Sequence, residues 1–260
     1  MLLGVNIDHI AVLREARAIN DPNPLDALGI CKLCQVDQIT IHLREDRRHI
    51  NDNDAKNIIT LSQLPVNLEC SIDDNIIDIV CALQPHRATI VPENRAEVTT
   101  EGGLDLQNNF NKIKKVVKKL HKAGIEVSLF IDPTLEAIKL SNKLNVEFVE
   151  LHTGSFANTY AMLYSGLEKT KYSIKELELS RDKLKKLLDK SIIELEKSTQ
   201  LANELGLKVA AGHGLNYQNV KDIVDIETIE ELNIGQSIVA RSIWVGLHQA
   251  IVDMKKLMER

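Results

Sequence analysis

The sequence lacks any long hydrophobic run and has few cysteines, and both absences narrow the class of protein. No stretch approaches the roughly 20 consecutive apolar residues that a membrane-spanning helix needs. Four cysteines in 260 residues are too few for a disulfide framework, which favours a reducing, cytoplasmic location. Cys31 and Cys34 have the spacing of a redox or metal motif. They lie in a helical pattern with no second pair, so a buried helix face is their expected role.

Two further absences concern partners and targeting. Basic residues are not gathered into blocks and the formal net charge is -5, so neither nucleic acid nor a membrane is an expected partner. Residues 1–10 are apolar, but they lack a basic start and contain Asp8 and His9. They are therefore expected to form a first strand rather than a signal peptide.

Short runs of β-branched residues recur along the chain, and a helical pattern follows each one. Eight strands are expected, at residues 2–8, 38–44, 66–71, 88–92, 126–132, 148–153, 208–212 and 231–235. Helix start signals stand between them at residues 22–24, 53–54, 73–74, 108–109 and 133. Eight such units without a linker favour one α/β domain over residues 1–260, a closed (β/α)8 TIM barrel with additional helices. An open doubly wound sheet is the alternative.

Residues 168–197 depart from this pattern because more than half of them are charged. Leu177, Leu184, Leu188 and Leu195 form a narrow apolar stripe with helical spacing. We expect an extended charged helical segment at about 160–200. It either lies solvated on the barrel or carries an inserted hairpin that packs on a neighbouring subunit.

In a parallel barrel the chemistry lies at the carboxyl ends of the strands, so the strand ends identify candidate site residues. These ends are unusually polar. They carry Asn6, Asp8, His9, His42, Arg44, Asn67, Glu69, Asp132, Glu150, His152, His213 and Asn233. Taken singly, Glu69 could be a buried ion-pair partner and His213 a polar turn residue. Together the histidines and glutamates predict proton transfer at neutral pH, since imidazole titrates near 6.5 and a crowded carboxyl can be raised toward that value.

Glycines and missing lysines refine this prediction. Gly212, Gly214 and Gly235 follow strands seven and eight, where barrels hold phosphate on backbone N–H groups, so a phosphorylated substrate is expected. The loop at 99–103 contains Gly102 and Gly103 and is expected to act as a lid. No strand ends in a lysine, so a Schiff base with the protein is not expected.

A metal-dependent reaction stays open at this point. His42, Glu69, Glu150 and His213 could supply two histidines and two carboxylates to a divalent ion. The corresponding function would be a metal-dependent aldolase or epimerase that acts on a sugar phosphate.

Eight motifs spread over nearly the whole chain are distinctive in combination. They are N-I-D-H at 6–9, H-L-R-E-D-R-R-H at 42–49, N-L-E at 67–69, V-P-E at 91–93, E-V-T-T-E-G-G at 97–103, E-L-H-T-G at 150–154, A-G-H-G at 211–214 and E-L-N-I-G at 231–235. With these motifs the chain resembles the pyridoxine 5'-phosphate synthase family of vitamin B6 biosynthesis.

The resemblance implies a (β/α)8 barrel enzyme that condenses 1-deoxy-D-xylulose 5-phosphate with 3-amino-2-oxopropyl phosphate. The product is pyridoxine 5'-phosphate, with release of phosphate and water, and the family uses neither a metal nor an organic cofactor. The implied partners are phosphorylated small molecules and further copies of the chain in a homo-octamer.

The resemblance also implies roles for individual residues. His42 corresponds to the general base, Glu69 to a second acid or base, His213 to the proton donor and Glu150 to a transition-state stabiliser. The positions that bind the aminoketone phosphate are Asn6, Arg17, Gly214, Gly235 and Gln236. Those that bind the deoxyxylulose phosphate are Asp8, His9, Arg44, His49 and Thr99. Gln236 departs from the family, which commonly has a histidine there, and the 168–197 segment is longer than the family pattern.

Overall fold

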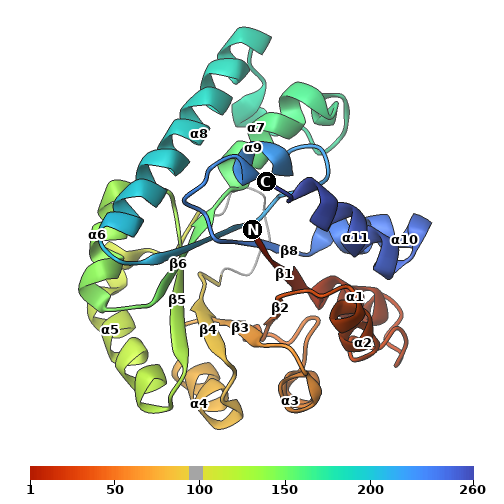
Figure 1. Ribbon diagram of the computed structural model, residues 1–260, viewed down its shortest axis with the longest axis vertical. Helices are drawn as coiled ribbons and strands as arrows, with labels where there is room; N and C mark the ends of the chain where they lie inside the picture. Colours follow the sequence, from red (N-terminus) through yellow and green to blue (C-terminus); the bar gives the residue numbers. More distant parts are fainter. Residues whose placement is uncertain (94–101) are drawn as a thin grey trace.

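The computed structural model describes residues 1–93 and 102–260 and shows a barrel of parallel strands ringed by helices (Figure 1). The strands follow one another around the barrel in sequence order, and β8 pairs with β1 to close it. They are β1 (Leu2–Asn6), β2 (Gln38–His42), β3 (Val66–Cys70), β4 (Arg87–Ile90), β5 (Glu126–Ile131), β6 (Phe148–His152), β7 (Lys208–Gly212) and β8 (Glu231–Ile234). The (β/α)8 barrel predicted from the sequence is confirmed, whereas the open sheet is wrong.

Helices alternate with the strands, and additional ones follow β1, β6 and β8. The described helices are α1 (Asp8–Glu15), α2 (Asp26–Leu33), α3 (Asp52–Leu61), α4 (Asp74–Leu83), α5 (Leu106–Lys122), α6 (Leu135–Leu144), α7 (Gly154–Tyr164), α8 (Arg181–Glu204), α9 (Val220–Val224), α10 (Gln236–Val245) and α11 (Leu247–Leu257), with short 3-10 turns η1 (Leu167–Lys169) and η2 (Lys175–Leu177). Within the described residues, no helix is both long and apolar enough to span a membrane.

The helix starts follow from local capping chemistry. Asn51 and Asp54 form a reciprocal capping box at the start of α3, and the Asp73 carboxylate accepts two backbone N–H groups at the start of α4. Helix α5 begins before the predicted signal at 108–109, because Asp105 caps it by accepting the backbone N–H of Asn108. Short polar side chains therefore set the point at which each of these helices begins.

The barrel interior is filled by hydrogen-bonded polar side chains. In β2, Ile39 and Ile41 belong to the buried apolar core. The intervening Thr40 instead donates from Oγ1 to Asn233 Oδ1 on β8 (3.2 Å). This contact crosses β1 at Gly4, where a Cβ would lie 2.0 Å from Asn233 Oδ1. The alternation of strand residues thus sends apolar groups to the helices and polar groups to the interior, where barrels usually carry branched apolar residues.

Arg87 joins strands from opposite sides of the barrel at its amino-terminal end. Its Nη1 donates to Glu231 Oε1 on β8 (2.9 Å) and its Nε donates to Glu126 Oε2 on β5 (2.8 Å). The guanidinium carbon lies 3.5 Å from the centroid of the Phe148 ring. The buried guanidinium is therefore paired with two carboxylates and an aromatic face, which offset the cost of removing its charge from water.

The charged segment forms a long helix that starts later than its leucine pattern indicates. Helix α8 begins at Arg181, and it packs against α6 and α7 on the outside of the barrel (Figure 1). Leu184, Leu188 and Leu195 are buried, but Leu177 lies apart from them in the turn η2. The apolar stripe therefore faces the barrel, and packing on a neighbouring subunit stays a prediction.

The cysteine pair lies where the sequence predicts it. Cys31 is in α2 and fully buried, and Cys34 follows directly after this helix and is also buried. Burial raises the pKa of the Cys31 thiol to about 12, so the reactive thiolate form is disfavoured. Both cysteines are therefore packed in the core at α2, as the sequence predicts.

Candidate active site

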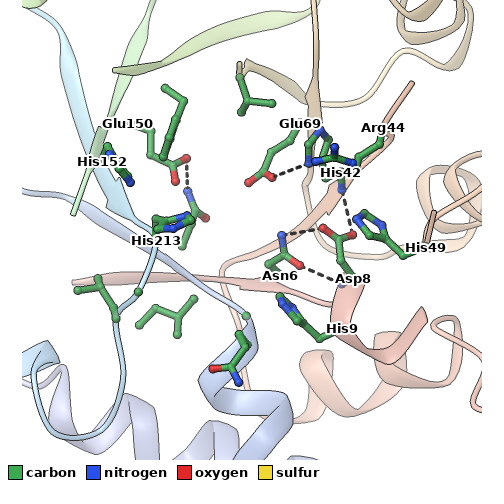
Figure 2. A pocket seen from close by; sticks show the side chains of 18 of the residues that line it. Asn6, Asp8, His9, His42, Arg44, His49, Glu69, Glu150, His152 and His213 are labelled. Atoms are coloured by element: carbon green, nitrogen blue, oxygen red, sulfur yellow. Dashed lines mark hydrogen bonds and ion pairs between the residues drawn. The ribbon is translucent and has the colours of Figure 1, made fainter. Parts of the chain in front are cut away.

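A cavity of about 500 Å³ opens at the carboxyl ends of the strands (Figure 2). Two groups of side chains face each other across it. The β1–β3 group consists of Asn6, Asp8, His9, His42, Arg44, His49 and Glu69, and the β6–β8 group consists of Glu150, His152, His213 and Asn233. The barrel topology, not closeness in sequence, brings these two groups together.

Asp8 organises the β1–β3 group. The Asn6 amide donates from Nδ2 to Asp8 Oδ2 (2.9 Å), and the backbone N–H of His42 donates to Asp8 Oδ1 (2.9 Å). Asp8 is buried as the first residue of α1, where its negative charge suits the helix N-terminus. It thereby couples the ends of β1 and β2.

The His42 imidazole lies between two carboxyl groups. Its Nε2 is 3.1 Å from Glu93 Oε1, and its Nδ1 is 3.9 Å from Glu69 Oε2. Burial alone would raise the pKa of Glu93, but the hydrogen bonds from His42 and from the Glu45 N–H lower it below its usual value. Glu93 is thus an ionised anchor that orients the ring.

Glu69 is a carboxyl of the cavity that is disposed to keep its proton. Its surroundings raise its pKa well above the ordinary value, and the nearby charges of Glu150 and Asp8 raise it further. A carboxyl with a raised pKa has the property that a general acid or base needs.

His49 is held by contacts that fix its protonation. Its Nδ1 accepts the backbone N–H of Ile50 (2.8 Å), and burial followed by the charges of His42 and Arg44 lowers its pKa to about 3. Behind it, Arg14 donates to the His49 carbonyl (2.9 Å) and forms a buried ion pair with Asp54. His49 is therefore a neutral imidazole that presents Nε2–H.

In the β6–β8 group, Asn233 holds Glu150. Asn233 Nδ2 donates to Glu150 Oε2 (2.8 Å) and lies 3.3 Å from Glu231 Oε1 beneath it. Burial and the charge of Glu231 raise the pKa of Glu150 to about 7. Gly212 leaves room for this carboxyl, since a Cβ there would lie 2.4 Å from Glu150 Oε1.

His213 sits on a strained turn that Thr153 secures. The φ angle of His213 is 78°, in the left-handed region that non-glycine residues rarely adopt. Thr153 Oγ1 lies 2.7 Å from the Gly212 carbonyl oxygen and 2.6 Å from that of His213, so its single hydrogen is shared between the two acceptors. The imidazole faces the cavity, yet the surrounding protein and the nearby His152 lower its pKa to about 4. His213 is therefore neutral at neutral pH.

The structure gathers most of the predicted site residues around the cavity. Those that line it are Asn6, Asp8, His9, His42, Arg44, His49, Glu69, Glu150, His213, Gly214, Gly235 and Gln236. Arg17 is exposed after the end of α1 and does not line the cavity. Thr99 lies outside the described residues. The predicted lid at 99–103 can be followed only at Gly102 and Gly103.

Gly103 serves a close approach of backbones. A Cβ there would lie 2.2 Å from the Asp132 nitrogen, and the Gly103 N–H donates to Asp132 Oδ1 (2.9 Å). The glycine is thus needed where the chain packs against the end of β5.

Four residues that complete the site received no role of their own from the sequence, although Asp132, His152 and Asn233 are among the polar strand ends noted above. The four are Glu93, Asp132, His152 and Asn233, of which only His152 and Asn233 line the cavity. Each stands at or just after a strand end, which is the signal that marked the other candidates. Their partners could not be chosen from spacing alone, because those partners lie on other strands.

The four residues that a metal-dependent reaction would use do not form one ligand set. His42 and Glu69 lie in one group, and Glu150 and His213 lie in the other (Figure 2). Across residues 1–93 and 102–260, no three histidine, cysteine, aspartate or glutamate side chains come together to hold a metal ion.

Known proteins identify the family. The model of the family described as "Pyridoxal phosphate biosynthesis protein PdxJ" matches residues 3–260. The chain belongs to this family. It is 71% identical over 259 residues to the pyridoxine 5'-phosphate synthase of Aliarcobacter butzleri (strain RM4018), covering 100% of this chain and 99% of that protein. The pyridoxine 5'-phosphate synthase of Sulfurovum sp. (strain NBC37-1) is 62% identical over 258 residues, covering 99% and 100%. The family predicted from the sequence motifs is confirmed.

Solved structures share the fold at low sequence identity. The phosphoribosylanthranilate isomerase of Thermotoga maritima aligns with a TM-score of 0.55 and 12% identity, over 99% of this chain and 98% of that one. The isomerase of Thermus thermophilus aligns with a TM-score of 0.54 and 10% identity, over 99% and 100%. These likenesses support the barrel alone.

Proposed function

We propose that this chain is a pyridoxine 5'-phosphate synthase that condenses 1-deoxy-D-xylulose 5-phosphate with 3-amino-2-oxopropyl phosphate. One observation carries this proposal. Side chains that can transfer protons lie on opposite walls of one cavity, with His42 and Glu69 on one wall and Glu150 and His213 on the other. Ring closure between two small molecules needs several proton transfers and dehydrations at different atoms. A single acid or base could not reach all of them.

The chemistry of the two walls fits different steps. His42, oriented by Glu93, accepts a proton from one substrate, and the neighbouring Glu69 can donate or accept a second one. On the opposite wall, the neutral His213 ring can donate its N–H to a substrate oxygen and polarise the C–O bond. Glu150 stabilises positive charge that develops beside it when it is ionised.

Two phosphate groups call for two anion-binding regions. The N-terminus of α10 opens into the cavity at Gly235 and Gln236, where backbone N–H groups can bind the aminoketone phosphate, together with Asn6 and Gly214. On the other wall, Arg44, His9 and His49 would bind the phosphate of the deoxyxylulose substrate, and Asp8 would accept from one of its hydroxyl groups. The resemblance adds Thr99, which lies outside the described residues. No lysine lines the cavity within the described residues, which suits a reaction in which the substrate supplies the amine.

The test is to mix the purified protein with both substrates and to detect pyridoxine 5'-phosphate by absorbance and mass. We expect product only when both substrates are present, and we expect the same rate in excess chelator. Absence of product would overturn the proposed function. Loss of the activity in chelator would instead favour the metal-dependent alternative.

We also propose that the chain forms a homo-oligomer in the cytoplasm, an octamer by its resemblance to the family. An apolar surface on α1 and α10 supports assembly, because Trp244 is 84% exposed and Ile243, Val12 and Leu13 are also exposed. The four cysteines of the described residues are free, which suits a reducing compartment. Light scattering of the wild type and of Trp244→Ser tests the assembly, and a monomeric wild type would contradict it.

A further inference from the structure

His152 is a buried histidine to which no step above gives a role. It ends β6 and lines the cavity, although only 7% of the residue is exposed. Its ring lies edge-on to His213, with the two centroids 4.9 Å apart, and 5.1 Å from the Phe130 ring. Figure 2 shows His152 and His213 side by side on the wall that also carries Glu150.

Asp132 fixes the hydrogen of this imidazole. Asp132 Oδ1 lies 3.3 Å from His152 Nδ1, and the hydrogen bond from His152 lowers the pKa of Asp132. An ionised carboxylate can only accept a hydrogen bond, so His152 carries its hydrogen on Nδ1. Nε2 then has a free lone pair.

Within the described residues, His152 Nε2 is buried and has no hydrogen-bond partner. It lies beside the first turn of α7, where a Cβ on Gly154 would sit 2.3 Å from His152 Nε2 and 3.2 Å from His213 Cδ2. Glycine at this position therefore lets both rings occupy the same small space. A buried acceptor without a hydrogen-bond partner is unusual, and His152 Nε2 is one beside His213, the residue to which proton transfer is assigned.

We propose that Asp132 and His152 are positioning residues of a relay that ends at His213. In this arrangement a protonated His213 donates a hydrogen bond to His152 Nε2, while the Nδ1–H of His152 donates to Asp132. A neutral His152 that accepts this hydrogen bond stabilises the cationic form of His213, which the surrounding protein and a charged His152 would disfavour. His213, which is otherwise neutral at neutral pH, can thereby act as a proton donor.

The relay rests on the proposed function, in particular on its dehydrations. In such a step, His213 takes a proton from a carbon of the intermediate. As the C–H electron pair forms the new double bond, the C–O bond on the neighbouring carbon breaks, and the hydroxyl group leaves as water with the proton that His213 returns. His213 is neutral before and after, and the relay carries the charge only between the two transfers.

Kinetics on Asp132→Asn, His152→Asn and the double variant tests the relay. We expect His152→Asn to lower kcat by roughly 10- to 100-fold with little change in KM, and Asp132→Asn to lower it by roughly tenfold or more. The double variant should be no worse than His152→Asn, because Asp132 acts through His152. Independent, multiplying losses would overturn the relay, as would wild-type kcat in His152→Asn.

The pH profile separates this role from a merely structural one. Among the described residues, the titratable groups that face the His152–His213 pair are Asp132 after β5 and Glu150 on β6. In the plot of kcat against pH, the limb that reports the protonation of His213 should move to lower pH in both single variants. The reason is that protonated His213 loses its hydrogen-bond acceptor or the carboxylate that orients it. An unchanged profile would contradict the proposal.

A matched control and a second observable complete the test. His121 pairs with Glu147 at 3.2 Å on the protein surface, so His121→Asn removes the same kind of pair without change in the rate. Nitrogen NMR of ¹⁵N-labelled histidine should show His152 protonated at Nδ1 in the wild type and altered in Asp132→Asn. A wild-type His152 protonated at Nε2 would overturn the relay, whether or not the protein is active. Inactivity of the wild type on the two substrates would instead refute the proposed function.

Discussion

At the scale of single residues, Glu150 links stability to pH. Burial and Glu231 raise its pKa from 4.5 to about 7 in the folded protein. Between these values the folded state holds a proton that the unfolded chain has lost. The free energy of unfolding therefore falls by roughly 3 kcal/mol through this group as the pH rises through this window.

Glu150→Gln removes this titration while it keeps the acceptor for Asn233. The variant should gain stability over the wild type as the pH rises, with a difference of roughly 3 kcal/mol above about pH 7 and almost none near about pH 4.5. Its turnover should fall because the charge is lost. Urea unfolding of both proteins at several pH values measures this, and a difference that does not change with pH would contradict it.

Thr153 is a second residue whose effect can be isolated. Thr153→Val keeps the shape but leaves the carbonyls of Gly212 and His213 without their hydroxyl donor. We expect a loss of about 1–3 kcal/mol in unfolding free energy and a lower kcat, since the His213 turn relaxes. Thr159→Val is the control, because that hydroxyl donates to the Ser155 carbonyl within its own helix. Equal effects of both changes would contradict the role given to Thr153.

At the scale of elements, the N-terminus of α10 decides how the aminoketone phosphate is held. Gln236 is exposed at the first position of this helix, and the backbone N–H groups there do not depend on its side chain. Gln236→Ala should therefore raise the KM for this substrate by no more than roughly tenfold.

Gln236→His restores the residue that is common in the family. It should lower the same KM only below about pH 6.5, where the imidazole is charged. KM for each substrate at two pH values tests both variants. A loss of two or more orders of magnitude in Gln236→Ala would show that the side chain, not the backbone, holds the phosphate.

At the scale of the whole molecule, Arg87 ties β4 to β5 and to β8 across the barrel. Arg87→Met leaves Glu231 and Glu126 without their cation, and we expect a loss of about 3–5 kcal/mol in unfolding free energy. Lys119→Met breaks a solvent-exposed ion pair with Asp78 and should cause no measurable change. Urea unfolding of the two variants makes the comparison, and equal stability would show that the interior charges do not hold the barrel together.

The sequence alone determined the strands, the barrel and most of the cavity-lining residues. These features follow from local rules. Alternation along a strand decides which side chains share a face, and in a parallel barrel every strand ends at the same rim. His42, Glu69, Glu150 and His213 could therefore be placed at one site before any contact was known.

Only the tertiary structure decided which of these side chains touch. Asn233 reaches Glu150 from 83 positions away, and Arg87 reaches Glu231 from 144 positions away. Such contacts depend on the register between strands and on how far each strand end reaches into the cavity. Neither of these is encoded in a local pattern. The same holds for Asp132 and His152, which were visible as polar strand ends, and for Arg17, whose exposed position no spacing could reveal. Local periodicity fixes the face on which a side chain lies, whereas barrel closure fixes its partner.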